Sequence, residues 1–311
     1  MTPPKFLITG ATGATGGNAA RKLLEKAHSV RVLAHRPDQR SEQLRELGAE
    51  VVLADLLDFD SVRAALSGVQ RAYFCYPISP GLVQATAQFA QAAKEAGAEV
   101  IVNMSQISAR SDAKSEAARQ HWLSERVFDW SQVPTVHLRP TFFAEWLLYL
   151  APMIRQGKIL APFTTTGRHA PVAAEDQARV IVAILVNPTA HLGKTYPLFG
   201  PVEFTLPEIA AIVSRVIGKE VTYQQVPIER YAEIYSGRPK GPAQNTAMAM
   251  YGDQGPTGGS PKTFLMQHLH EVAIDHSNGI FAGTNNYLAE IGGREPMTVE
   301  EFVTRNREAF V

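Results

Sequence analysis

The chain is poor in cysteine, has no excess of charge of either sign and contains no long apolar run. Among its 311 residues there is one cysteine, and 30 basic residues balance 30 acidic ones. Nucleic acids and anionic membranes require a basic surface, and no run of Lys and Arg supplies one. No apolar stretch reaches the roughly 18 residues of a membrane-spanning helix. We therefore expect neither a nucleic-acid nor a membrane partner, and the sequence suggests no metal site.

Two smaller features bear on location and reactivity. The Met-Thr-Pro-Pro start leads directly into an apolar run, which leaves no room for a cleavable leader, so we expect a cytoplasmic protein. Cys75 lies inside the apolar run of residues 72–76. Its surroundings favour a buried packing role over that of a nucleophile.

The most informative segment is a glycine-rich turn near the start. Residues 5–9 are typical of a strand, and Gly10, Gly13 and Gly16 precede a helical pattern. Gly10 can adopt a tight turn, Gly13 allows close approach of a pyrophosphate, and Gly16 allows the helix to pack against the strand. The helix N-terminus would direct its N–H groups at the phosphates. A plain strand-to-helix turn is the alternative. The expected cofactor contacts here are Gly10, Thr12, Gly13, Ala14, Thr15 and Gly16.

Alternating strand and helix patterns predict an α/β fold. Strands are expected near residues 5–9, 29–34, 50–54, 70–75, 98–104 and 133–139, and helices near 15–27, 40–47, 59–66, 80–96 and 114–131. Continuous apolar runs such as residues 100–102 are typical of strands covered on both faces. We therefore predict a doubly wound parallel sheet, a Rossmann domain, over residues 1–150.

After Pro140 the pattern changes. It predicts helices near residues 141–156, 174–187 and 206–217 and strands near 194–198 and 220–226. We interpret residues 151–311 as a smaller mixed α/β substrate subdomain. A long loop rich in Gly and Pro spans 236–262, and it is either a functional lid or a disordered connector.

The ends of the second and third strands indicate which dinucleotide is bound. NAD enzymes usually present an acid to the ribose 2′-hydroxyl here, whereas NADP enzymes present an arginine to the 2′-phosphate. Arg36 stands at this position, and Arg40 could add a second charge. Both could instead be solvated surface residues. Asp55, beside Leu56, is expected either to accept a hydrogen bond from the adenine or to cap the next helix. The expected cofactor is NADP(H).

The order of several further segments resembles the NmrA-like group of atypical short-chain dehydrogenase/reductases, which includes NADPH-dependent quinone reductases, triphenylmethane reductase and redox-sensing regulators. These segments are residues 10–17, 102–105, 121–126, 138–145, 175–178, 193–201 and 300–303. The resemblance covers most of the chain. Besides the glycine turn and Arg36, it implies NADP(H) contacts from Tyr76, Pro77, Ser105, Pro140, Thr141 and Phe142.

The residues for proton transfer depart from the common pattern. Ordinary short-chain reductases place a serine after the fifth strand and a Tyr-x-x-x-Lys pair on the next helix. Ser105 fits the serine, but Trp122 and Arg126 stand at the tyrosine and lysine places. Reduction of ketones by the standard triad is therefore not expected. His121 could act as an acid near neutral pH or be a structural histidine. Ser105 and His121 are the candidate catalytic residues.

Two functions from different classes fit these residues. One is an NADPH-dependent oxidoreductase that reduces a quinone-like or conjugated acceptor by direct hydride transfer, a reaction that needs little acid catalysis. The other is a non-catalytic NADP(H)-binding redox sensor, and an isomerase or lyase that uses NADP as a transient hydride store is also open. Phe142, Phe143, Trp146 and Tyr149, on the helix expected after Pro140, form either an aromatic substrate wall or core packing. The oligomeric state is open, with a homodimer as one option.

Overall fold

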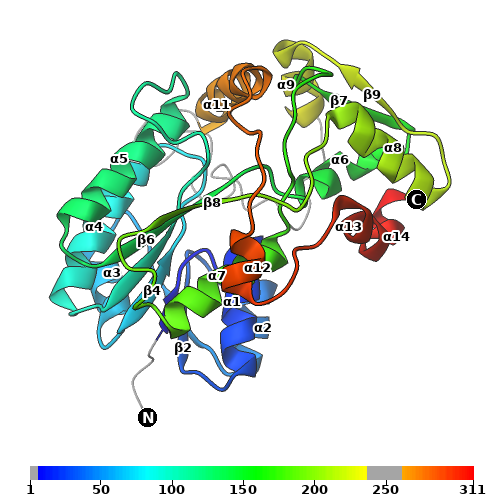
Figure 1. Cartoon of the computed structure of the whole chain (residues 1–311). Coiled ribbons are helices and arrows are strands. Elements are labelled where there is room, and N and C mark those ends of the chain that lie inside the picture. The colour runs from blue at the N-terminus through cyan, green and yellow to red at the C-terminus, as the bar shows by residue number, and fades with distance from the viewer. Residues whose placement is uncertain (1–5, 237–260) are drawn as a thin grey trace.

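Seven parallel strands form the central sheet of the computed structural model, in which residues 6–236 and 261–311 are described (Figure 1). The strand order is β3-β2-β1-β4-β5-β6-β8. This confirms the predicted doubly wound fold, with the order reversing between β1 and β4. The strands are β1 (Phe6–Ile8), β2 (Val30–Ala34), β3 (Glu50–Leu53), β4 (Arg71–Phe74), β5 (Val100–Met104), β6 (Thr135–Pro140) and β8 (Thr195–Leu198).

Helices cover both faces of this sheet (Figure 1). Because successive side chains of a strand point to opposite faces, Tyr73 of β4 packs in one core while Ala72 and Phe74 pack in the other. Both faces are buried, which explains the continuous apolar runs of the sequence. On the Tyr73 face lie α1 (Ala14–Glu25), α2 (Gln39–Glu46), α7 (Ala174–Val186) and α12 (Tyr287–Gly292). On the other face lie α3 (Phe59–Leu66), α4 (Leu82–Glu95) and α5 (Glu116–Trp130).

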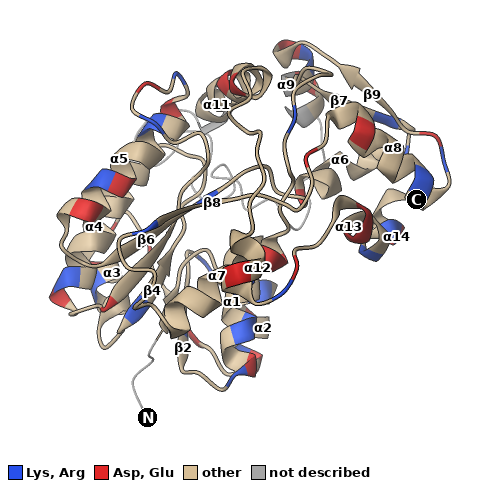
Figure 2. Cartoon of the chain, in the orientation of Figure 1, with Lys and Arg blue, Asp and Glu red and all other residues tan. Residues whose placement is uncertain are grey.

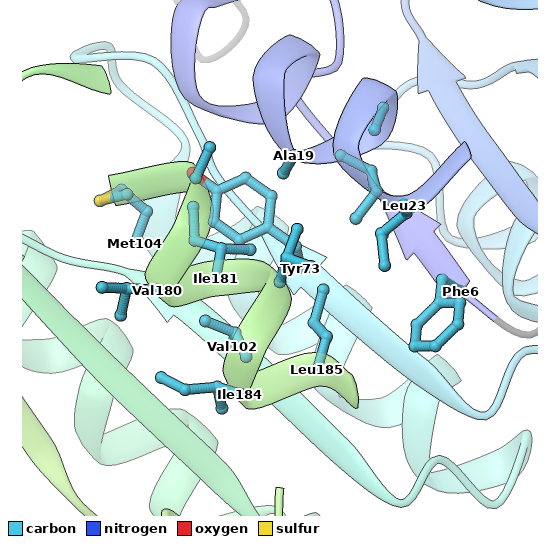
Figure 3. Close-up of a cluster of buried hydrophobic side chains, with 14 of the residues drawn as sticks. Phe6, Ala19, Leu23, Tyr73, Val102, Met104, Val180, Ile181, Ile184 and Leu185 are labelled. Carbon is cyan, nitrogen blue, oxygen red and sulfur yellow. The ribbon is translucent and has the colours of Figure 1, made fainter. Parts of the chain in front are cut away.

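Helices α1 and α7 pack against each other over the sheet. Figure 3 shows Ala19 and Leu23 of α1 near Ile181 and Leu185 of α7, with Tyr73 of the sheet among them. The Tyr73 hydroxyl lies 2.9 Å from Thr15 Oγ1, so even the buried phenol has a hydrogen-bond partner. This packing fixes the start of α1, and therefore the glycine turn, relative to the sheet.

A second lobe has its own apolar core beside the sheet (Figure 1). Its β7 and β9 pair in parallel as a separate two-stranded sheet. Because β8 and α7 also come from beyond residue 150 and belong to the central sheet layers, these layers draw on both halves of the sequence. The lobe contains α6 (Trp146–Ile154), β7 (Lys158–Ala161), α8 (Leu206–Ile217), β9 (Thr222–Gln225), α9 (Ile228–Ser236), α11 (Pro261–Ser277), α13 (Val299–Arg305) and α14 (Arg307–Phe310).

One predicted element was wrong at its start. The helix expected from residue 141 begins only at Trp146, so Phe142 and Phe143 do not lie on it. Before it, Phe143 forms an isolated β-bridge with Val172, followed by a turn: Val172 donates to the Phe142 carbonyl and Ala144 donates to the Val172 carbonyl. The other predicted helices and strands agree with the structure within a few residues. The predicted loop at 236–262 lies almost wholly outside the described residues.

Charged side chains are distributed over the whole molecule. Figure 2 shows Lys and Arg interspersed with Asp and Glu on the helices of both lobes. Within the described ranges, no helix combines the length and apolar character needed to cross a membrane.

Candidate functional site

A cavity of about 530 Å³ runs along the carboxyl ends of strands β1 to β6. It crosses the place where the strand order reverses, which is where open α/β sheets bind ligands. Two of the predicted site residues, Gly16 and Asp55, do not line it. The predicted residues that do line it are Gly10, Thr12, Gly13, Ala14, Thr15, Arg36, Leu56, Tyr76, Pro77, Ser105, His121, Pro140, Thr141, Phe142, Phe143, Trp146 and Tyr149.

The glycine turn has the geometry of a phosphate cradle. Gly10 has φ +59°, and the Gly13 N–H group donates a 2.9 Å hydrogen bond to the Gly10 carbonyl oxygen. Gly13 is also the N-cap of α1 and has no side chain to bond the first N–H groups of that helix. These donors, with the positive end of the helix dipole, are therefore available to an anion in the cavity.

Gly13 and Gly16 are glycines for different reasons. Gly13 lines the cavity, and a Cβ there would lie 3.2 Å from the Gly10 carbonyl oxygen. A Cβ at Gly16 would lie 2.4 Å from the same oxygen, which no backbone tolerates. Gly16 thus permits close packing of α1 on β1 and does not contact the cavity.

Arg36 is the free cation at one end of the cavity. It is exposed, lines the cavity and forms no hydrogen bond or ion pair within the described part of the chain. Arg40, which was expected to add a second charge, is engaged elsewhere: it bonds Asp38 Oδ2 at 2.6 Å and the Thr12 carbonyl at 2.8 Å. Asp38 is an acid on the cavity wall that the sequence interpretation overlooked. It caps α2 and pairs with Arg40, so its charge is already compensated.

Asp55 has a local structural partner. Its Oδ1 accepts a 2.9 Å hydrogen bond from Leu57 N–H, and its Oδ2 lies 3.8 Å from His35 Nε2. The cap of α3 is Asp58, which bonds Asp60 N–H. Leu56, and not Asp55, faces the cavity at this strand end.

Ser105 belongs to a buried polar network that the sequence did not reveal. Its hydroxyl donates a 2.6 Å hydrogen bond to Glu125, a fully buried residue of α5. Arg139 of β6 binds both carboxyl oxygens of Glu125, at 2.8 and 2.5 Å. The sequence does contain a pattern that could have indicated this network. Glu125 lies one helical turn after His121 on the buried side of α5, and Arg139 is a charged residue in a mainly apolar strand.

His121 and its neighbour His268 are buried and uncharged at neutral pH. Burial, reinforced by the proximity of His268, lowers the pKa of His121 to about 4. Burial also lowers the pKa of His268 to about 4, and its Nδ1 lies 2.7 Å from the Ser115 hydroxyl. The protonated His121 suggested by the sequence is therefore not the form present near pH 7. Trp122 lies outside the cavity wall, with its ring centroid 5.9 Å from the Arg126 guanidinium carbon.

The opposite end of the cavity is aromatic. The Phe142 ring lies 5.8 Å from Trp146, 5.2 Å from Phe163 and 4.7 Å from Phe281, measured between ring centroids. All four line the cavity. Such a wall suits a flat, apolar ligand. Sequence patterns predicted two of these residues; Phe163 and Phe281 come from distant segments.

Two further side chains of the cavity wall matter for reactivity. Burial raises the pKa of the Cys75 thiol to about 11, so it is not a thiolate at neutral pH, in keeping with the packing role expected of it. Glu145 was not predicted as a site residue, and it lines the aromatic end. Its burial raises the pKa of its carboxyl group to about 7.

Comparisons with known proteins agree with this geometry. The model of the NmrA-like family matches residues 3–303. The NAD(P)H azoreductase of Xenophilus azovorans is 27% identical over 98% of this chain and 99% of its own. The structure of an NADPH-dependent quinone oxidoreductase of Escherichia coli in complex with NADPH has a TM-score of 0.79, 23% identity, and coverage of 97% and 99% of the two chains. The negative transcriptional regulator NmrA, in complex with NAD, has a TM-score of 0.74 at 16% identity, with coverage of 97% and 95%.

Proposed function

The chain belongs to the NmrA-like family, and we propose that it is an NADPH-dependent oxidoreductase that reduces quinone-like or other conjugated acceptors. The observation that carries the proposal is a single cavity that joins the glycine turn and Arg36 at one end to an aromatic wall at the other. A dinucleotide needs the phosphate-binding groups of the first end, and a flat acceptor needs the aromatic wall of the second. Relatives that reduce azo compounds and quinones support this acceptor class.

The residues present fit NADPH. The uncapped N-terminus of α1, with Gly13 on the cavity wall, would bind the pyrophosphate. Arg36 would bind the 2′-phosphate through its free guanidinium group. When bound, NADPH supplies a hydride.

The protein's own contribution to the reaction is to position the acceptor and exclude water. Phe142, Trp146 and Phe281 would hold a flat ring at the end of the cavity remote from Arg36. A conjugated acceptor delocalises the electron pair it receives, so positioning supplies much of the rate enhancement. This is why the absence of the tyrosine and lysine from their usual places, where Trp122 and Arg126 stand, does not argue against catalysis.

The residues at the usual tyrosine and lysine places, Trp122 and Arg126, favour a second candidate function, that of a redox sensor that binds NADP(H) without turnover. Trp122 and Arg126 contact each other, and neither lines the cavity. A protein that only binds the dinucleotide would not need a proton-donating pair there.

One experiment separates the two candidates. We would measure NADPH binding by calorimetry and steady-state NADPH oxidation with a simple benzoquinone and with an azo dye. Turnover with either acceptor supports the oxidoreductase. Tight NADPH binding with no turnover of any acceptor supports the sensor, and failure to bind NADPH contradicts both.

A further inference from the structure

Among the described residues, Glu145 is the carboxylic acid at the aromatic end of the cavity. It directly precedes α6 and lines the cavity with Phe142 and Trp146. The other acid of the cavity wall, Asp38, lies at the Arg36 end and is paired with Arg40. If the acceptor binds against the aromatic wall, Glu145 is therefore the acid on its side of the cavity.

The contacts of Glu145 leave it without a counter-ion. Both of its carboxyl oxygens accept from the Ala174 N–H group at the start of α7, at 2.9 and 3.1 Å, and the carboxyl group also accepts from the backbone N–H of Glu145 itself. Within the described ranges no Lys, Arg or His forms an ion pair with it. The neighbouring Asp176, by contrast, bonds Arg179 at 2.5 Å. A carboxylate that is half-buried and has no counter-ion is costly, so the neutral acid is favoured.

The charges around Glu145 act in the same direction. Burial raises its pKa to about 7, the Ala174 hydrogen bond opposes this, and the nearby Asp176 and Glu175 add to the rise. Near neutral pH the group is thus present in both protonation states, as a general acid should be. The charged groups that act on it are Glu175 and Asp176 of α7. Three further titratable groups share the cavity wall with it: Tyr149 of α6, His121 of α5 and His268 of α11.

Four other side chains of the cavity wall do not meet this requirement. His121 and His268 are neutral above about pH 4, and the Cys75 thiol holds its proton until about pH 11. The proton of Ser105 is committed to Glu125.

We propose that Glu145 is the proton donor of this site, transferring its carboxyl proton to the oxygen anion of the reduced acceptor. The proposal rests on the proposed function. Reduction of a quinone by a hydride from NADPH gives NADP⁺ and a hydroquinone monoanion. The O–H bond of Glu145 then breaks as the second O–H bond of the hydroquinone forms, and the carboxylate regains a proton from water. A phenolate is a stronger base than a carboxylate with this environment, so the transfer is downhill.

Glu145→Gln is the decisive variant, because its amide oxygen can still accept from Ala174 N–H but the side chain cannot titrate. With a benzoquinone and saturating NADPH, wild-type kcat should fall as the pH rises through about 7. In Glu145→Gln, kcat at pH 6 should be lower, by up to about 10²-fold, and independent of pH between 5.5 and 8.5, because the acid that protonates the reduced acceptor has been removed. NADPH affinity should not change.

Glu175→Gln is the matched control, since Glu175 is a nearby acid that pairs with Lys22 and Arg305 and does not line the cavity. Its kcat at pH 6 should equal that of the wild type, with the midpoint of the profile slightly lower. A second readout needs no turnover: an infrared titration, wild type minus Glu145→Gln, should show one protonated carboxyl band lost near pH 7.

The outcomes separate this proposal from the proposed function. A wild type that reduces the quinone, with a Glu145→Gln variant of the same kcat and pH profile, overturns only the role of Glu145. A wild type without turnover overturns both. Should Glu145→Gln not fold, a solvent isotope effect on wild-type kcat that disappears above pH 8 decides the matter, and the absence of this effect contradicts the proposal.

Discussion

Ser105 Oγ donates a 2.6 Å hydrogen bond to Glu125 Oε1 inside the protein. A hydroxyl group has one proton, so toward a ligand in the cavity Ser105 can only accept. The recipient carboxylate is fully buried and is bound on both oxygens by Arg139. Ser105 therefore connects the cavity wall to a buried ion pair, and this differs from a serine that donates to a substrate carbonyl.

This arrangement predicts that Ser105 and Glu125 contribute to stability more than to chemistry. Glu125→Gln should lower the free energy of unfolding by about 3 to 5 kcal/mol, because the Arg139 guanidinium loses its buried counter-ion. Ser105→Ala should cost about 1 to 2 kcal/mol and change kcat less than tenfold. Urea unfolding and steady-state kinetics check both. A Ser105→Ala variant of wild-type stability whose kcat is reduced 1000-fold would show that Ser105 donates to the substrate after all.

Cofactor selectivity should depend on Arg36 and not on Arg40. A charge-assisted phosphate contact of about 1.5 to 3 kcal/mol corresponds to a roughly ten- to hundredfold preference for NADPH over NADH. Arg36→Ala should remove that preference. Arg40→Ala is the matched control, since Arg40 is held by Asp38 and the Thr12 carbonyl. Calorimetric titration of both cofactors measures the ratio, and an unchanged ratio in Arg36→Ala would place the 2′-phosphate elsewhere.

The two glycines of the turn should respond differently to a side chain. Gly13 has an extended backbone, φ −92° and ψ 179°, which valine adopts readily, so Gly13→Val should fold but lose NADPH binding. Gly16→Ala places its Cβ 2.4 Å from the Gly10 carbonyl oxygen and should instead lower the melting temperature. Thermal unfolding with and without NADPH separates the two effects. Wild-type affinity in Gly13→Val would mean that the pyrophosphate does not approach this residue.

The parts of the fold that local patterns encode were predictable. The glycine turn, the order of strand and helix and the parallel sheet follow from spacing within about 30 residues, and the structure agrees with them. The non-helical segment before Trp146 was not predictable in this way, because it depends on a bridge between Phe143 and Val172. Local patterns favoured a helix there, and a contact from a distant segment prevailed.

The electrostatics of the site were hidden for the same reason. Glu145 is a charged residue near a helix start in the sequence, and only the fold surrounds it with Ala174, Glu175 and Asp176. Helix α11 is a further case, since Asp275 reaches Arg110 across 165 residues of sequence. The residue types of the sequence predicted many of the side chains that line the cavity. The protonation states of these side chains depend on burial, which the sequence alone does not give.

The buried histidines predict that the fold is sensitive to acid. His169 Nδ1 lies 3.1 Å from His276 Nε2, and burial, together with this proximity, lowers the pKa of His169 to about 3, while burial lowers the pKa of His276 to about 4. The unfolded chain binds more protons than the native state below about pH 6.5, so stability present above that pH is lost as the pH falls towards 4. Each such histidine adds up to about 1.4 kcal/mol per pH unit to this slope.

Urea unfolding between pH 4.5 and 7.5 measures that slope. His276→Asn should reduce it by about 1.4 kcal/mol per pH unit, whatever the variant's absolute stability. The exposed His270 of the same helix supplies the control substitution, His270→Asn. An unchanged slope in His276→Asn would show that this imidazole titrates in the folded protein as it does in the unfolded chain, and would contradict the prediction.

Acceptor preference should favour quinones and other conjugated compounds over simple ketones. The tyrosine that would protonate a developing alkoxide is absent from its usual place, where Trp122 stands outside the cavity wall. Loss of a positioned acid typically costs a factor of about 10² to 10⁴, which a delocalised acceptor tolerates better than a ketone does. The proton that we assign to Glu145 reaches the acceptor after hydride transfer, so it assists the conjugated product and does not replace the tyrosine.

The comparison is kcat/KM for a benzoquinone and for a simple ketone in the same preparation, with His121→Ala as internal control. That variant should retain the quinone activity, because a neutral imidazole with a pKa of about 4 is a weak proton source at pH 7. Equal rates with both acceptors would mean that an acid positioned like the missing tyrosine exists; tight NADPH binding with neither acceptor reduced would make the sensor the better description of this protein.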